Sequence, residues 1–311
     1  MTDAAHTGPD RLVHVYYSED YVLSEYGFDT TRKAAWIASD LDAAPIPGII
    51  LQTPDPLTAA QLTQMHDPAY VDAVRIGEPA DLAESNGFTW DPGLFRMVCS
   101  SNGGAVAAAR RALATKGVAG SLSSGLHHAR KRGGAGFCTF NGLALAARAA
   151  LDDGARRILV IDLDAHCGGG TAELLGGDAR IASVDIAVNA FDIYATPAGF
   201  TLDLVRDADD YLPTLRRRLD ALDPAAFDLV LYNAGMDPYE KCQIGGLRGM
   251  THAVLAEREA TVFAWCQAVG LPVAFVMAGG YTNSGFAQEE LVALHRLTIS
   301  AAATHASRAS A

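Results

Sequence analysis

The chain has 311 residues, half of them in the hydrophobic set, and its 24 Lys and Arg against 36 Asp and Glu give a net charge of −12. This length is enough to bury a sizeable core in one large α/β domain or in two ordinary ones. Only 19 % of the residues are charged, which excludes a disordered polyelectrolyte. No basic run is longer than three residues. Nucleic-acid binding, which requires the neutralisation of phosphates, is therefore disfavoured, and a neutral or cationic ligand fits better.

The sequence contains no signal for a membrane or for secretion. No stretch of about 18 uncharged apolar residues appears, and the first residues are polar rather than basic and then apolar. The cysteines are odd in number and have no CxxC spacing; they are Cys99, Cys138, Cys167, Cys242 and Cys266. We therefore expect a protein of the reducing cytoplasm without a disulfide framework. Homo-oligomerisation stays open.

Apolar runs alternate with amphipathic helical patterns along the chain. In chain order, the sequence predicts a helix over 103–114, a strand over 118–122, a helix over 141–151, strands over 157–162 and 180–185, a helix over 211–222, a strand over 228–232, a helix over 254–268 and a strand over 272–277. Such alternation is typical of a parallel, doubly wound sheet. We expect one domain over residues 11–300, with flexible ends at 1–10 and 301–311.

Polar residues follow four of the predicted strands. They are Asp162, Asp164, His166, Asp237, His127, His128 and Tyr281. In doubly wound folds, ligands bind beyond the carboxyl ends of the strands. Alternate residues of an extended segment also point the same way, so Asp162, Asp164 and His166 can converge at one strand end.

The chemistry that these residue types suggest is that of a mononuclear metal hydrolase. Two carboxylates and one imidazole, Asp164, Asp237 and His166, suit Zn²⁺ in a site with open positions. A neighbouring histidine can accept a proton from water, and a tyrosine hydroxyl can stabilise a developing oxyanion. This set predicts amide hydrolysis without a covalent intermediate.

Four ordered motifs resemble those of the zinc-dependent deacetylases of the histone deacetylase family. They are GLHHARKRGGAGFCTFN, VIDLDAHCGGGT, YNAGMDP and AGGY. The similarity covers about Arg11 to Ser300 and includes HDPAYVDAV near Met65. DLDAH, YNAG and Asp185 look most like the class IV branch and its bacterial relatives.

The resemblance implies an arginase/deacetylase-type α/β fold of three layers, with a central, mostly parallel sheet and helices on both faces. By motif, Asp164, His166 and Asp237 match the zinc ligands. Fe²⁺ fits the same ligand set, so the sequence does not decide which metal is loaded in the cell. Gly136 and Phe137 match the positions that line the narrow acyl-lysine channel.

The resemblance also implies roles for the remaining motif residues. His127 and His128 match the paired histidines, of which the second is the usual general base. Tyr281 matches the tyrosine that binds the substrate carbonyl. Asp162 matches the carboxylate that orients the first histidine and helps to hold a structural monovalent cation such as K⁺, which Asp185 is also expected to contact.

The chain departs from the family pattern at three places. The Asn or Asp that usually sits behind the second histidine is Gly169, so we expect His128 to lack its partner unless water or a backbone carbonyl replaces it. Such partners typically matter about 10- to 100-fold. Where the family commonly has an acidic residue before Arg-Leu-Gly, this chain has EKCQIG at 240–245. Where many relatives have Ser-x-His, it has DIA at 185–187. The first two changes suggest an altered acyl or amine preference, or a slow enzyme.

The leading hypothesis is a zinc-dependent amidohydrolase that removes an acetyl or longer acyl group from an acyl-lysine side chain in a protein or peptide. The alternatives are a deacylase of a small-molecule or unusual amine, such as a polyamine or an acyl-guanidine, and a weakly active acyl-binding module, which Gly169 motivates. The acidic charge is compatible with a polyamine and with a basic peptide and does not choose between them, and only the changed residues near Gly169 and at 241–243 motivate the acyl-guanidine. An arginase-type enzyme needs a second metal, and Cys167 and Gly168 stand where its second carboxylate is expected.

Overall fold

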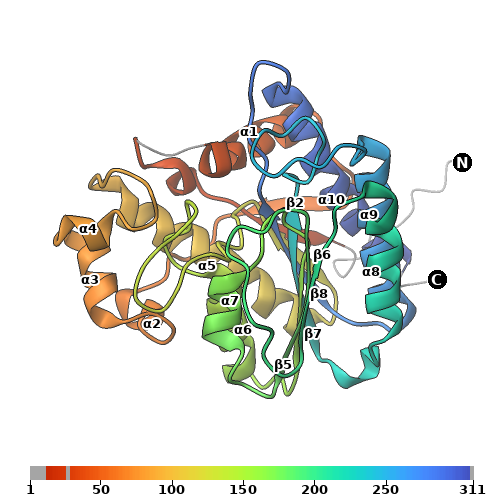
Figure 1. The fold of residues 1–311 in the computed structure, drawn as a ribbon, viewed down its shortest axis with the longest axis horizontal. Helices are drawn as coiled ribbons and strands as arrows, with labels where there is room; N and C mark the ends of the chain where they lie inside the picture. The colour runs from red at the N-terminus through yellow and green to blue at the C-terminus, as the bar shows by residue number, and fades with distance from the viewer. Residues whose placement is uncertain (1–11, 26–28, 309–311) are drawn as a thin grey trace, which may run out of the picture.

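The computed structural model describes residues 12–25 and 29–308. Within this part of the chain, eight parallel strands form one sheet in the order β2-β1-β3-β8-β7-β4-β5-β6 (Figure 1). The strands are β1 Val13–Tyr16, β2 Ile49–Gln52, β3 Val118–Ser121, β4 Ile158–Asp162, β5 Ile181–Ala187, β6 Phe200–Leu204, β7 Leu229–Gly235 and β8 Val273–Ala278. The predicted α/β class and parallel sheet are confirmed.

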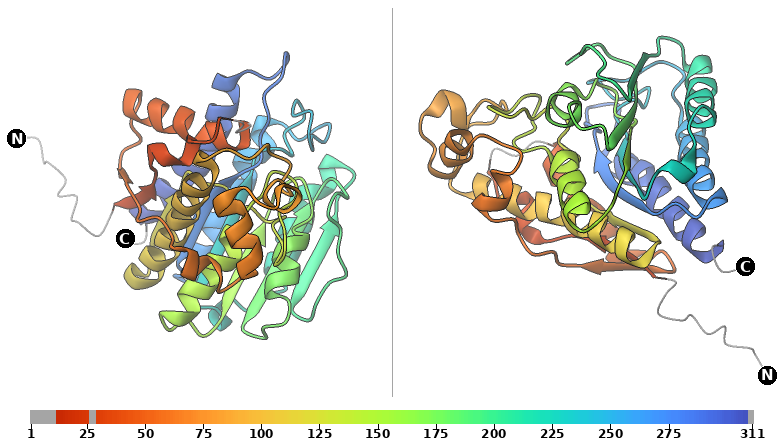
Figure 2. Two further views of the ribbon diagram at one scale, coloured as in Figure 1. Left: turned by 90° about the vertical axis from the view of Figure 1, so that its left-hand side faces the viewer. Right: turned by 90° about the horizontal axis from the view of Figure 1, so that it is seen from below.

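Helices cover both faces of this sheet (Figure 2). The α-helices of the described residues are α1 Asp29–Ala43, α2 Ala59–Leu62, α3 Pro68–Ile76, α4 Ala80–Ala83, α5 Gly93–Thr115, α6 Gly142–Asp152, α7 Gly169–Leu175, α8 Tyr211–Asp220, α9 His252–Ala268 and α10 Gln288–Arg308. Of these, α2, α3 and α4 do not cover the sheet but pack in a separate cluster with α5 and α6. Buried side chains of α1, α8, α9 and α10 pack on one face, and those of α5, α6 and α7 on the other. The expected three-layer arrangement is therefore present. No described helix is long and apolar enough to cross a membrane.

The apolar run of β4 shows why the sheet needs cover on both faces. Leu159 and Ile161 belong to the core cluster on the α9 and α10 side, whereas Ile158 and Val160 belong to the cluster on the α5 and α6 side. Successive residues of a strand point to opposite faces. A strand that is apolar at every position is thus stable only between two layers of helices.

Several boundaries differ from the sequence prediction. The strand predicted over 228–232 continues to Gly235, because β8 pairs with Asn233, Ala234 and Gly235 and β4 also pairs with Asn233. The last helix continues to Arg308, so part of the expected loose tail is helical. The strands β1, β2 and β6, of which β2 and β6 form the two edges of the sheet, were not predicted.

A buried ion pair joins α9 to the sheet. The guanidinium of Arg258 is wholly buried, and its Nε and Nη2 atoms donate to Glu259 Oε1 at 2.8 and 2.7 Å. Its Nη1 atom donates to the carbonyl oxygen of Leu163 at 3.1 Å, next to the end of β4. The hydroxyl of Tyr232 donates to the same Glu259 oxygen at 2.8 Å. The pair therefore connects the helix layer to the segment that follows β4.

We expect Arg258→Met to lower the free energy of unfolding by about 3–5 kcal/mol, because it leaves the buried Glu259 carboxylate without its cation. Urea denaturation measures the change. The control is Arg216→Met, which breaks the half-exposed Arg216–Glu257 pair and costs at most about 1 kcal/mol. Equal losses in the two variants would show that burial of the Arg258 pair has no such effect.

Candidate active site

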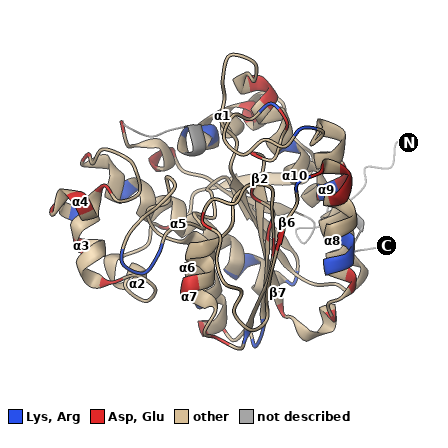
Figure 3. Ribbon diagram, viewed as in Figure 1, with Lys and Arg blue, Asp and Glu red and all other residues tan. Residues whose placement is uncertain are grey.

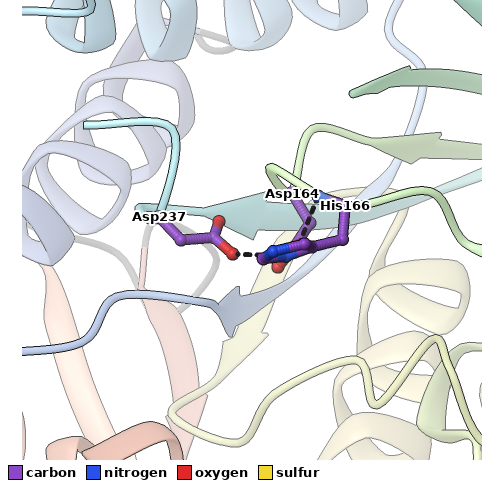
Figure 4. A group of neighbouring side chains, drawn as sticks. All are labelled: Asp164, His166 and Asp237. Carbon is purple, nitrogen blue, oxygen red and sulfur yellow. Dashed lines mark hydrogen bonds and ion pairs between the residues drawn. The ribbon is translucent and has the colours of Figure 1, made fainter. Parts of the chain in front are cut away.

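The loops that follow β4 and β7 bring three of the sequence-predicted residues together. Asp164 and His166 come after β4, Asp237 comes after β7, and the two strands are neighbours in the sheet. One ligand atom from each residue lies within 4.8 Å of the others, and all three side chains are buried (Figure 4). His166 Nδ1 is 3.1 Å from both Asp164 Oδ1 and Asp237 Oδ2.

The electrostatics of this cluster favour a bound cation. Burial alone would lower the pKa of His166, but the carboxylates of Asp164 and Asp237 outweigh burial and raise that pKa to about 10. Burial and the neighbouring Asp164 raise the pKa of Asp237 to about 6. Two carboxylates thus compete for one imidazole in a site shielded from water. Their donor set, two oxygens and one nitrogen, fits Zn²⁺ with open positions.

Two residues beside Asp237 hold the turn that follows β8. Gly279 has a φ of +51°, and a Cβ atom there would lie 2.2 Å from Asp237 Oδ1, so only glycine fits. Lys33, from α1, is fully buried and its Nζ atom donates to the carbonyl oxygen of Gly279. Burial lowers the pKa of Lys33 to about 8, although Asp237 and Asp164 oppose that shift. Lys33 was not predicted as a site residue, because one lysine in an amphipathic helix carries no functional signal.

His127 pairs with the carboxylate that the sequence assigned to it. Its Nδ1 atom lies 2.8 Å from Asp162 Oδ2, and Asn233 Nδ2 donates to the other Asp162 oxygen at 2.8 Å. Burial alone would lower the pKa of His127, but Asp162 and Asp164 outweigh burial and raise it to about 10. The pair with Asp162 therefore favours the protonated form of His127.

His128 also has a carboxylate partner, and the expectation that it lacks one is wrong. Its Nδ1 atom lies 2.9 Å from Asp192 Oδ2, in the loop between β5 and β6. Its Nε2 atom lies 3.1 Å from His127 Nε2, so the two imidazole rings are hydrogen-bonded to each other. Burial and the charge of His127 lower the pKa of His128 to about 4, despite Asp192. His128 is thus neutral and able to accept a proton.

Gly169 makes room for this partner. A Cβ atom on Gly169 would lie 2.5 Å from Asp192 Oδ1 and 2.6 Å from the Asp192 carbonyl oxygen. The missing side chain at position 169 and the carboxylate at position 192 therefore fill the same space. The sequence contained no signal for Asp192, since it lies outside the four motifs in a loop without a recognisable pattern.

A pocket of about 380 Å³ opens beside these groups. Its lining is His128, Gly136, Phe137, His166, Asn189, Phe191, Ile244 and Tyr281. Gly136 and Phe137 thus lie where the sequence expected a channel, whereas Phe191 was missed. The Phe191 ring lies 5.0 Å from that of His128 and forms an aromatic wall beside it. Burial and Asp237 raise the pKa of Tyr281 well above its ordinary value, so its hydroxyl keeps its proton.

Asp185 lies beside Asp162, as the expected monovalent-cation site requires. The two residues are paired in the β4–β5 register. Asp185 Oδ2 accepts hydrogen bonds from Gly168 N at 2.8 Å and from the Tyr194 hydroxyl at 3.0 Å. Its Oδ1 atom is buried and receives no hydrogen bond from the described residues. A K⁺ ion at this place stays a prediction.

The family model of the histone deacetylase domain matches residues 26–297. The chain belongs to the histone deacetylase family. Histone deacetylase 2 of Arabidopsis thaliana is 28 % identical over 311 aligned positions, which cover 89 % of this chain and 76 % of that protein. An uncharacterized protein of Picosynechococcus is 37 % identical over 240 positions, covering 75 % of this chain and 78 % of the relative.

The fold of this family member is also that of solved structures. The crystal structure of an acetylpolyamine aminohydrolase from Burkholderia pseudomallei superimposes with a TM-score of 0.76 at 20 % sequence identity, over 93 % of this chain and 98 % of that one. The family membership confirms the resemblance found in the sequence. It identifies a deacylase, a hydrolase acting on amide bonds, and leaves its specific substrate open.

We expect the purified deacylase to bind one Zn²⁺ through Asp164, His166 and Asp237, since among the described residues these three bring suitable ligand atoms within reach of one another. His166→Ala removes the single nitrogen ligand and lowers the zinc content measured by mass spectrometry to background. The exposed His252→Ala variant is the control and keeps the metal. Full zinc content in His166→Ala would contradict this assignment.

Proposed function

We propose that this chain is a zinc-dependent amidohydrolase that removes an acetyl or longer acyl group from an amine, with an acyl-lysine side chain as the preferred substrate. The observation that carries the proposal is the pocket, in which the apolar rings of Phe137 and Phe191 line the same cavity as His128, His166 and Tyr281. An unbranched methylene chain fits between apolar walls, and the amide at its end then meets the polar groups.

Asp164, His166 and Asp237 would hold the metal. When bound, Zn²⁺ polarises an amide carbonyl and lowers the pKa of water at the site. Phe137 and Phe191 bind the methylene chain and exclude bulk water from the reacting carbonyl.

In this proposal His128 moves the proton. Its neutral ring accepts a proton at Nε2 from the attacking water, and Asp192 stabilises the imidazolium that forms. The bond from the water oxygen to the acyl carbon forms, and the carbon–nitrogen bond breaks as His128 returns the proton to the leaving amine. His127 is held by Asp162, which raises its pKa and favours the charged ring, so it contributes positive charge beside the reacting groups rather than accepting the proton.

Tyr281 stabilises the negative charge that develops on the carbonyl oxygen. Its raised pKa keeps the hydroxyl protonated and able to donate a hydrogen bond. The preceding turn, held by Gly279 and Lys33, fixes the tyrosine beside Asp237. The products are a carboxylic acid and a free amine.

The carboxylate of Asp192 beside His128 weakens the acyl-binding-module alternative, because that hypothesis rested on a missing partner for His128. One observation supports a small-molecule amine substrate, namely that an acetylpolyamine aminohydrolase shares the fold. The net charge of −12 suits a cationic product, and because lysine and polyamines are both cationic, it does not discriminate between them.

Turnover of acyl-lysine peptides and acylated polyamines, each with acyl chains of increasing length, tests the proposed function. We expect the highest kcat/KM on an acyl-lysine peptide and complete loss of turnover with a chelator. Tyr281→Phe should lower kcat about 10²- to 10³-fold, because it removes one oxyanion donor. His128→Ala should lower kcat by about 10²- to 10⁴-fold. Higher kcat/KM on acylpolyamines would overturn the lysine preference, and chelator-resistant turnover would overturn the zinc mechanism.

Gly169→Ala should lower kcat by about 10-fold or more with little change in KM, since the added methyl group displaces Asp192 from His128. The matched control is Gly177→Ala, where an added methyl group meets nothing within 4 Å. Steady-state kinetics on one acyl-lysine peptide compare the two variants. Wild-type kcat in Gly169→Ala would show that Asp192 does not support His128.

A further inference from the structure

Beyond the groups that line the pocket, we infer that Arg130 is a positioning residue of the deacylase, which fixes His128 by holding Asp192 in place. Arg130 does not line the pocket, and it is separated from His128 by the Asp192 carboxylate. The inference rests on the proposed function, because it assigns His128 a proton-transfer role.

The two oxygens of Asp192 are divided between two partners. Oδ2 lies 2.9 Å from His128 Nδ1, and Oδ1 accepts a hydrogen bond from Arg130 Nη2. The Asp192 side chain is only 8 % exposed, so its carboxylate has little water to replace a lost partner. Rotation of this carboxylate toward one partner would therefore break its bond to the other.

The Asp192 backbone has a φ of +60°, a region that residues other than glycine seldom adopt. The loop around it is anchored by the Phe191 ring, which packs against His128, and by a hydrogen bond from Cys167 N to the Phe191 carbonyl oxygen at 3.1 Å. Within the described residues, the Asp192 carboxylate itself is bonded to His128 and Arg130, so the ion pair with Arg130 helps to hold it against the histidine.

Both the side chain and the backbone of Arg130 are fixed by hydrogen bonds. Its Nη1 atom donates to Glu173 Oε2 at 2.9 Å, and the other Glu173 oxygen accepts from Lys131 N at 3.1 Å. Its carbonyl oxygen lies 2.9 Å from His66 Nδ1, while His66 Nε2 accepts from Asn141 N at 3.0 Å. His66 belongs to HDPAYVDAV, the motif for which the mechanism gave no role.

The positive charge of Arg130 stabilises the ionised form of the Asp192 carboxylate. Burial alone would raise the pKa of Asp192, but His128 and Arg130 outweigh it and keep the pKa below its ordinary value. A buried carboxylate without a cation is costly, so it would turn toward solvent if Arg130 were removed. Arg130 lies in a run of three basic residues, drawn blue in Figure 3, and its neighbour Arg132 has a side chain that is 84 % exposed.

A double-mutant cycle on the zinc-loaded protein tests the inference with an acyl-lysine peptide. We expect Arg130→Ala to lower kcat about 10-fold and Asp192→Ala about 10- to 100-fold, with KM changed less than about 2-fold. Because Arg130 acts through Asp192, the double variant should be no slower than Asp192→Ala alone. Arg130→Lys should recover part of the loss, since an ammonium can still pair with Asp192. Arg132→Ala is the matched control and should keep the wild-type kcat.

A wild-type kcat in Arg130→Ala would overturn the inference. So would a double variant in which the separate effects of Arg130→Ala and Asp192→Ala on kcat multiply. A second cycle with Arg130→Gln and Asp192→Asn preserves side-chain size, and it decides the question if an alanine variant loses zinc or unfolds at a lower temperature. Multiplying effects in that cycle count equally against the inference. No turnover by the wild-type protein on any acylated amine would instead refute the proposed function, so the two failures are distinguishable.

Discussion

The constraint on which this structure depends is the gathering of buried negative charge at the carboxyl edge of the sheet. Strands β4 and β7 lie side by side, and the carboxylates of Asp162, Asp164 and Asp237 stand at or just beyond their ends, nearly out of reach of water. Each needs a compensating group, because an isolated ionised carboxylate is very unstable in a protein interior. The positions of the surrounding cationic side chains follow from this need.

The buried negative charge acts unequally on two adjacent histidines, His127 and His128, and their pKa values shift in opposite directions. His127 faces the carboxylates of Asp162 and Asp164 and is therefore charged. His128 is buried beside that charge and is therefore neutral, although it too has a carboxylate partner. Neighbouring residues of one type thus differ in protonation state because one is nearer the centre of negative charge. An acid–base mechanism requires such a difference, since a proton acceptor must begin without its proton.

Much of this arrangement could be predicted from the sequence. Strand–helix alternation indicated the parallel sheet, and residues placed after each apolar run indicated Asp164, His166 and Asp237, because parallel strands end at one edge. Asp192 and Lys33 could not be predicted in the same way. Asp192 lies in an irregular loop, and Lys33 reaches the site from a helix distant in the chain. Their positions depend on tertiary packing, which no local pattern encodes.

Gly169 shows most clearly the difference between what a local sequence pattern predicts and what tertiary packing determines. As a departure from the family pattern it indicated a defect, whereas in three dimensions it is the space that Asp192 occupies. The placement of the Asp192 carboxylate in the space beside Gly169 has a further consequence, because Asp192 is next to Phe191 in the loop between β5 and β6. A shift of this loop that widened the pocket for a bulkier acyl group would also draw the carboxylate away from His128. In this chain, the breadth of substrates accepted and the strength of the base are therefore mechanically linked, and a gain in one is expected to cost the other.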